Sequence, residues 1–112
     1  MMGTCHCSRC RKVGASTIIF TKKDHFQLTQ GEDMLQFYHP EEGYKYTRSF
    51  CKKCGTALGE IGSDSDSFPI PANTLDDAPG LSVQFHEFTS EKPDWYQICD
   101  EAKQFDGHPF TD

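Results

Sequence analysis

Apolar and polar residues alternate in short runs along this chain, and the alternation has the period of β-strands rather than of helices. Residues 15–20 are rich in β-branched side chains, and residues 81–88 place Leu81, Val83 and Phe85 on one face of an extended segment. The predicted strands are residues 15–20, 25–28, 34–39, 44–50, 57–62, 67–75, 81–88 and, as a short strand or turn, 93–98.

Turn and helix signals fit the same architecture. Pro40 and Gly43 predict a turn between the strands at residues 34–39 and 44–50. Pro69 and Pro71 lack backbone donors, so residues 67–75 are expected at a sheet edge or as an extended segment. The best helical signal lies within residues 7–15, where one helical turn is expected after Cys10. We therefore predict a single, mostly-β domain over residues 1–112.

Composition and charge narrow the class of protein. Acidic residues outnumber basic ones by 17 to 11, and no stripe of Lys and Arg is present for phosphate contacts, so we expect no nucleic-acid partner. No apolar run approaches the roughly 20 residues of a membrane helix, and the N-terminus lacks the apolar stretch of a signal peptide. We expect a cytoplasmic protein without a membrane partner, in which clustered cysteines indicate metal ligands rather than disulfides.

Five of the six cysteines lie in two clusters, CHCSRC at residues 5–10 and CKKC at residues 51–54. A Cys-x-x-Cys turn lets two thiolates chelate one zinc ion, and Gly55 suits such a turn because the turn often needs a positive φ. The chain between the clusters is long enough for hairpins to bring them together. The predicted zinc ligands are Cys5, Cys7, Cys10, Cys51 and Cys54.

The number of cysteines leaves two arrangements open. Cys5, Cys7 and Cys10 could hold one ion with a fourth position free, which distinguishes a catalytic zinc from a structural one. Cys51 and Cys54 need two further ligands of their own. Five cysteines cannot complete a closed four-cysteine site and a three-cysteine site together.

Three segments, in this order, resemble one known family: CHCSRCRKVGA from residue 5, RSFCKKCGTAL from residue 48 and HEFTSEKPDWYQICDE from residue 86. They are similar to the motifs of the glutathione-dependent formaldehyde-activating enzymes and centromere protein V, over nearly the whole chain from residue 4. The resemblance implies a zinc-containing, Mss4-like fold of coiled antiparallel sheets. In that family a later Cys-x-x-Cys, matched here by Cys51 and Cys54, shares a structural zinc with an N-terminal Cys-x-Cys. A looser zinc, proposed to be catalytic, is held by a motif that the triad at residues 5–10 matches.

The separate N-terminal Cys-x-Cys of that pattern is missing here. Either the protein is a member shortened at its N-terminus, or a further N-terminal segment carries that motif. In the shortened form we expect one zinc held by Cys51, Cys54 and two of the three N-terminal thiols. Symmetry between two Cys-x-x-Cys turns favours Cys7 and Cys10, whereas the Cys-x-Cys precedent favours Cys5 and Cys7. A truncated sheet edge would also favour a homodimer.

Two functions are compatible with these motifs. By resemblance, the protein is a carbon–sulfur lyase that reversibly adds a small aldehyde to a glutathione-like thiol, with zinc as Lewis acid. The alternative is a non-catalytic, zinc-stapled binding or scaffold domain, in which the metal only supplies folding free energy to a small core.

Some residues near the motifs are expected to have structural roles. His6, between two predicted ligands, is expected to point to solvent. His86 is expected to be a satisfied strand histidine, with a role in the site as the alternative. Trp95 and Tyr96 are expected to be core aromatics that cap the sheet.

Three other polar residues are expected to stay outside the site. Arg11 and Lys12 follow the triad and are expected to be solvated, with a contact to a substrate carboxylate as the alternative. Cys99 has no partner spacing and is expected to be a free thiol.

Overall fold

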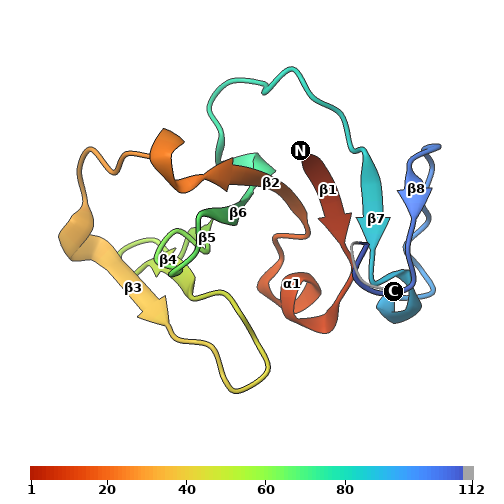
Figure 1. Ribbon diagram of the computed structural model, residues 1–112, viewed down its shortest axis with the longest axis horizontal. Coiled ribbons are helices and arrows are strands. Elements are labelled where there is room, and N and C mark those ends of the chain that lie inside the picture. Colours follow the sequence, from red (N-terminus) through yellow and green to blue (C-terminus); the bar gives the residue numbers. More distant parts are fainter. Residues whose placement is uncertain (110–112) are drawn as a thin grey trace.

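The structure is a computed structural model that describes residues 1–109, and it contains two β-sheets with one short α-helix beside them (Figure 1). The five-stranded sheet has the order β6-β2-β1-β7-β8, and the three-stranded sheet has the order β3-β4-β5. The strands are β1 (Met2–Cys5), β2 (Thr17–Lys22), β3 (Leu35–Tyr38), β4 (Arg48–Cys51), β5 (Ala57–Gly59), β6 (Ser67–Pro71), β7 (Phe85–Glu87) and β8 (Lys103–Gln104). The helix is α1 (Ser8–Val13), and 3₁₀ turns occupy Lys23–His25, Glu32–Met34, Ala72–Thr74 and Thr89–Glu91.

The mostly-β, Mss4-like fold class is confirmed, with one addition to the expected pairing. Strand β2 pairs antiparallel with β1 and β6, and β4 pairs antiparallel with β3 and β5. Strand β7, however, runs parallel to both β1 and β8. Gly3 permits the close approach of β1 and β7, because the ring of Phe85 occupies the space that a Cβ at residue 3 would need.

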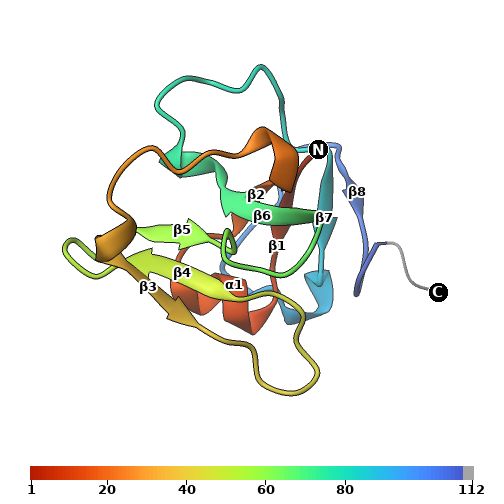
Figure 2. The same ribbon diagram turned by 60° about the vertical axis from the view of Figure 1, so that its left-hand side comes forward.

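The two sheets meet where β5 passes beside β6 (Figure 2). The backbone N–H of Glu60, just after β5, donates to the carbonyl of Pro69 in β6 at 3.0 Å. A Cβ at Gly59 would clash with that Pro69 carbonyl, and Gly59 also has φ +75°, so glycine is required at this junction. As predicted from its prolines, β6 lies at the edge of the five-stranded sheet.

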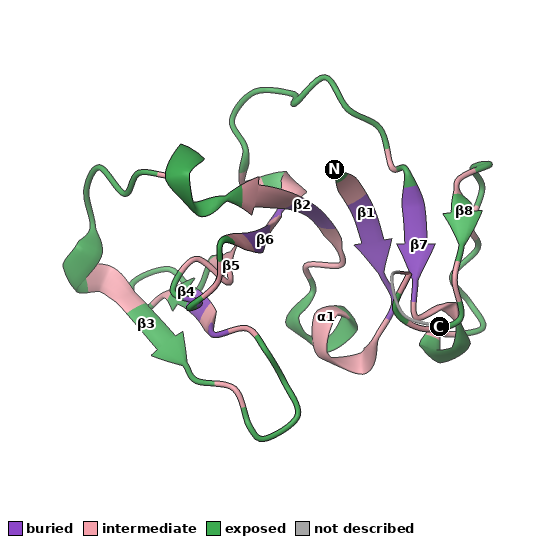
Figure 3. Cartoon of the chain, in the orientation of Figure 1, coloured by how far each residue is buried: buried purple, intermediate pink, exposed green. Residues whose placement is uncertain are grey.

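The apolar core is small and lies in the five-stranded sheet, where β1 and β7 are largely buried (Figure 3). It consists of Cys5, Ile18, Ile19, Phe68 and Phe85. The ring of Phe26 packs edge-on against Phe68, with centroids 5.5 Å apart. A core of this size contributes a small folding free energy, to which a bound metal ion would add.

Several sequence predictions of strands were wrong. Residues 25–28 form no strand, and the strand predicted at 81–88 is reduced to Phe85–Glu87. Residues 93–98 form the turn that was the alternative to a strand, with the N–H of Tyr96 donating to the carbonyl of Pro93 at 3.1 Å. Strand β1 was not predicted, because its four residues carry no alternation and it forms through pairing with β2 and β7 on both sides. The helix begins at Ser8, within the cysteine motif rather than after it.

The expected aromatic cap on the sheet was also wrong. Trp95 is 79% exposed and Tyr96 is 38% exposed, so neither residue is part of the core. The physical reason is that residues 93–98 form no strand that could turn these rings onto a sheet face. Tyr96 instead packs its ring edge against His6, with centroids 5.3 Å apart.

Candidate metal centre

The N-terminal cysteine cluster is built by the junction of β1 and α1. Strand β1 ends at Cys5, and Cys7 is the N-cap of α1, with its sulfur accepting a hydrogen bond from the backbone N–H of Cys10 at 3.5 Å. One helical turn therefore returns Cys10 to the side on which Cys7 lies. Gly14 ends the helix with φ 82°, and its N–H caps the carbonyls of Cys10 and Arg11.

The three thiols converge on one point. The sulfur atoms of Cys5, Cys7 and Cys10 all lie within 4.8 Å of one another, and those of Cys5 and Cys7 are 3.3 Å apart. In a tetrahedral zinc site, Zn–S bonds of about 2.3 Å place the sulfurs about 3.8 Å apart. Three soft sulfur donors at this spacing therefore fit a zinc ion, with a fourth coordination position left for another ligand.

The protonation of the triad favours a single shared negative charge. Hydrogen bonds from the thiols of Cys10 and Cys5 lower the pKa of Cys7 well below its usual range. Hydrogen bonds with Cys10 and Cys7, together with burial, raise the pKa of Cys5. For Cys10 the hydrogen bond with Cys5 lowers the pKa, but the hydrogen bond with Cys7 and burial outweigh it and raise the pKa to about 12. A divalent cation would thus exchange for the protons of Cys5 and Cys10.

The second cysteine pair forms the tip of the β4–β5 hairpin. The N–H of Gly55 donates to the carbonyl of Cys51 at 2.6 Å, and Gly55 has φ 79°, as the turn prediction required. The Thr56 hydroxyl lies 3.1 Å from the sulfur of Cys54, and hydrogen bonding to Thr56 lowers the pKa of that exposed thiol. Neither cysteine belongs to the N-terminal group of sulfurs. That Cys51 and Cys54 share a zinc ion with two of those thiols stays a prediction.

A cavity of about 710 Å³ opens beside the triad. Its volume is in the range of small-molecule sites. Residues of α1 and of strands β1, β2, β6 and β7 line it together with residues of β3, β4 and β5, so it lies between the two sheets. The charged and titratable side chains that line it are Cys5, Cys7, Arg9, Cys10, Tyr38, Tyr44, Lys45, Tyr46, Arg48, Glu60, Glu87, Glu91 and His108.

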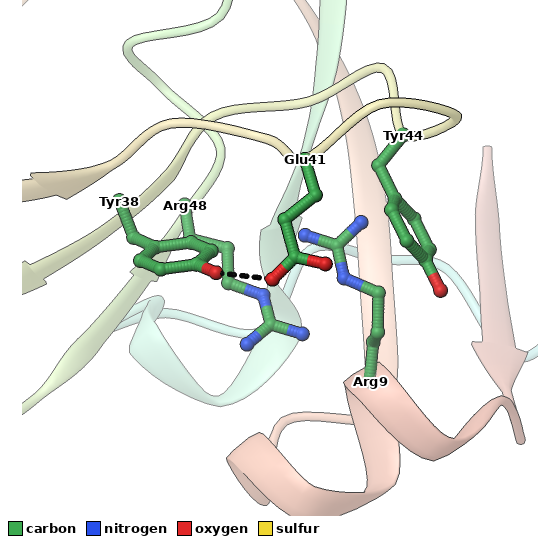
Figure 4. A pocket seen from close by; sticks show the side chains of 5 residues that line it. All are labelled: Arg9, Tyr38, Glu41, Tyr44 and Arg48. Atoms are coloured by element: carbon green, nitrogen blue, oxygen red, sulfur yellow. Dashed lines mark hydrogen bonds between the residues drawn. The ribbon is translucent and has the colours of Figure 1, made fainter.

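Two guanidinium groups stand at the mouth of this cavity (Figure 4). Arg9 rises from α1 and lies over the ring of Tyr44, 4.1 Å from its centroid. Arg48 comes from β4, and beside it the hydroxyl of Tyr38 donates to Glu41 at 2.7 Å. These five side chains enclose a smaller pocket of about 200 Å³. The cluster offers planar donors suited to a carboxylate.

The prediction that His6 points to solvent was wrong. His6 is 4% exposed, and its Nε2 lies 2.8 Å from Nδ1 of His86, which is 2% exposed. The alternation of an extended chain explains this result, since Cys5 and Cys7 point to one side and His6 points to the other. That alternation was a signal in the sequence for the direction of the His6 side chain, whereas its burial depends on the packing of β7 beside β1.

His86 continues the contact to the C-terminal segment. Its Nε2 lies 3.0 Å from both carboxylate oxygens of Asp100, and a carboxylate only accepts, so this nitrogen donates. The Nδ1 of His86 lies 2.8 Å from the Nε2 of His6, and the tautomers of the two rings decide which of these nitrogens donates. Burial, and then the charges of His86 and Lys92, lower the pKa of His6, which favours its neutral form. The contacts from His6 through His86 to Asp100 link the cysteine segment at residues 5–10 to β7. Both ring nitrogens of His86 have partners, as expected for a strand histidine with satisfied hydrogen bonds.

The remaining predictions on single residues have clear outcomes. Arg11 and Lys12 are exposed and do not line the cavity, in agreement with their prediction as solvated residues. Cys99 is exposed and lies outside the sulfur cluster. The sequence analysis did not identify Arg9 as a residue that lines the cavity. Its position between Cys7 and Cys10 in the motif was a signal that it lies beside the site.

Residues 1–91 match the sequence profile of the glutathione-dependent formaldehyde-activating enzymes. The chain belongs to this family. Within the family, a cluster of cysteines able to hold a metal ion is the expected feature, and the triad at residues 5–10 supplies it here.

Comparison with solved structures supports the same fold. A crystal structure of a Rhodobacter sphaeroides protein is 19% identical to this chain with a TM-score of 0.56, and the match covers 72% of this chain and 71% of that one. Curated protein sequences gave no match. Among residues 1–109, no helix is long and apolar enough to cross a bilayer.

Proposed function

We propose that the protein is a zinc-dependent carbon–sulfur lyase that reversibly adds a small aldehyde to a glutathione-like thiol. The observation that carries this proposal is the position of three thiols beside a cavity of about 710 Å³. A structural zinc is closed by four protein ligands, whereas three thiolates next to a cavity leave one position for a reactant. Membership of the family points to the same reaction class.

Each part of the site has a role in this proposal. Zinc held by Cys5, Cys7 and Cys10 would supply Lewis-acid polarisation of the aldehyde carbonyl. Arg9 and Arg48 would bind carboxylates of the thiol substrate and orient its sulfur toward the triad. A cytoplasmic location, where cysteines stay reduced, would keep both the triad and a glutathione-like substrate in their thiol forms.

Exchange spectroscopy by NMR tests the activity directly, with glutathione and formaldehyde at equilibrium with their hydroxymethyl thioether adduct. We expect the zinc-loaded protein to accelerate exchange, and Cys10→Ser to abolish both the acceleration and the metal bound at the triad. Cys99→Ser is the matched control, because Cys99 is exposed and outside the cluster, and it should leave exchange unchanged. The proposal fails if the zinc-loaded, unaltered protein leaves exchange at its spontaneous rate.

Metal analysis separates this proposal from the scaffold alternative. A zinc ion lost on Cys10→Ser but retained in Cys51→Ser supports the lyase. A single zinc ion that both variants lose, in a protein without effect on exchange, supports a zinc-stapled domain in which Cys51 and Cys54 complete a closed site.

A further inference from the structure

Glu60 is held rigidly where the two sheets meet. Its N–H donates to Pro69 of β6 at 3.0 Å, and its carbonyl accepts from the N–H of Ser63 at 3.1 Å. Gly59, directly before it, packs against β6 with no room for a side chain. The backbone is therefore fixed on both sides, and the side chain of Glu60 lines the cavity beside the cysteine triad.

The side chain of Glu60 is half-buried, and one oxygen of its carboxyl group is buried without a hydrogen bond. Its Oε2 is the one buried side-chain nitrogen or oxygen in residues 1–109 that lacks a hydrogen-bond partner. Leaving such an atom unpaired costs on the order of 1–3 kcal/mol, so native proteins rarely retain one without a function. In the same part of the chain, neither Arg9 nor Arg48 forms an ion pair with Glu60. Glu60 lines the cavity, and its unpaired oxygen is the atom that a substrate bound there would satisfy.

The surroundings of Glu60 keep its proton exchangeable near neutral pH. Burial raises its pKa from the ordinary 4.5 to about 7, although the charges of Arg9 on α1 and Arg48 on β4 oppose the shift. The charge of Cys7 adds to the increase, and Cys10 is the other titratable group that interacts with this carboxyl. A proton-transfer group works best when its pKa lies near the working pH.

We propose that Glu60 is the catalytic residue that transfers the proton between the thiol and the aldehyde oxygen. This inference rests on the function proposed above. In the direction of addition, the Glu60 carboxylate takes the S–H proton, and the sulfur electron pair forms the C–S bond as the carbonyl π bond breaks. The electron pair of that bond moves to oxygen, which then receives the proton from Glu60. The step consumes no oxidant or reductant, and the carboxylate is regenerated.

The other acid buried beside the triad is less suited to this role. Burial raises the pKa of Glu87, and its interaction with the thiol of Cys5 opposes this increase. Neither of its oxygens is among the buried atoms without a hydrogen-bond partner in residues 1–109. His6 is engaged with His86 and points away from the side on which Cys5 and Cys7 lie. Glu60 alone combines a place in the cavity wall with a buried, unpaired oxygen in the described chain.

The kinetic test compares the unaltered zinc-loaded protein with Glu60→Gln, which keeps the shape of the side chain and removes the proton site. We expect kcat/KM for adduct formation to fall about 100-fold or more, since positioned acid–base groups contribute about 100- to 10,000-fold. The pH–rate limb that Glu60 contributes should disappear while bound zinc is unchanged. Glu60→Asp should restore part of the rate. Glu42→Gln, the same change at an exposed loop residue outside the cavity wall, should leave the rate unaltered.

An infrared titration tests the carboxyl group independently of activity. The C=O stretch of a protonated carboxyl should titrate near pH 7 in the unaltered protein and be missing from Glu60→Gln. Full activity with an unchanged pH profile in Glu60→Gln overturns this inference while the lyase proposal stands. A protein without effect on exchange overturns both, and a Glu60 that titrates at an ordinary carboxyl pKa overturns the proton-transfer role by itself.

Discussion

The triad at residues 5–10 places three ionisable sulfurs within one coordination sphere, and the protons of these sulfurs decide how it binds metal. Hydrogen bonds to Cys7 stabilise its thiolate, while Cys5 and Cys10 retain their protons. The metal-free cluster therefore carries about one negative charge near neutral pH. A divalent ion must displace the other protons before three thiolates can bind it.

We predict that binding of one zinc ion to the triad releases about two protons near pH 7. Calorimetry in buffers of different ionisation enthalpy measures this number. Cys10→Ser should lower both the zinc affinity and the number of protons released, whereas Cys99→Ser should change neither. Release of no protons would show that all three thiols are already ionised, which contradicts the hydrogen-bonded arrangement of the cluster.

Two arginines of α1, two positions apart, have different environments. Arg9 lines the cavity and stacks on Tyr44, whereas Arg11 is exposed and outside it. We predict that Arg9→Gln raises KM for glutathione by about 10- to 100-fold, because a charged hydrogen bond contributes about 1.5–3 kcal/mol. Arg11→Gln removes the same charge from the same helix and should leave KM unchanged. Equal effects of the two substitutions would indicate a general electrostatic attraction rather than a carboxylate contact.

At the scale of elements, the parallel pairing of β1 with β7 brings the cysteine loop next to the C-terminal part of the chain. The His6 N–H continues the ladder by donating to the carbonyl of Glu87 at 2.9 Å. The stacked rings of His6 and His86 add a side-chain link across the same two strands. The loop that carries the triad is thus anchored by an element 80 residues further along the sequence.

We predict that His86→Ala lowers the free energy of unfolding by about 2–4 kcal/mol, because it removes a buried ring and leaves His6 without its partner. Urea denaturation at matched zinc content measures the change. His25→Ala, at an exposed position, should change stability by less than about 0.5 kcal/mol. A neutral effect of His86→Ala would show that the link between the strands contributes nothing to stability.

The elements that were predicted correctly are those with a strong local pattern. Ile18, Ile19 and Phe20 identified β2, and Phe37 and Tyr38 identified β3. Residues 25–28 also alternate, but this segment has no neighbouring strand to pair with. Strand β1 had no pattern and formed because it had two neighbours. Pairing partners distant in sequence decide such cases, and local alternation does not report them.

At the scale of the whole molecule, the cavity between the sheets keeps an acid partly protonated, and this links folding to pH. In the folded protein the pKa of Glu60 is about 7, compared with an ordinary value of 4.5. Between these values the folded state binds more protons than the unfolded chain. Stability from this group is therefore fully present below pH 4.5 and is lost as the pH rises toward 7.

We predict that the free energy of unfolding decreases between pH 4.5 and 7 relative to that of Glu60→Gln. The slope of the difference should be at most about 1.4 kcal/mol per pH unit. Urea denaturation of both proteins across this range, at matched zinc content, measures it. A difference that stays constant with pH would mean that Glu60 has the same pKa in both states.

The sequence by itself determined the β-rich class, the family and the cysteines that are candidate metal ligands. These features depend on local patterns and on short motifs whose residues are neighbours along one turn of chain, as Cys5, Cys7 and Cys10 are. Only the tertiary structure decided that His6 is buried, that Arg9 and Arg48 flank the cavity, and that Glu60 lies in its wall with an unpaired oxygen. These properties depend on the packing of one sheet against the other, which sets burial and electrostatic environment through contacts between residues far apart in the chain.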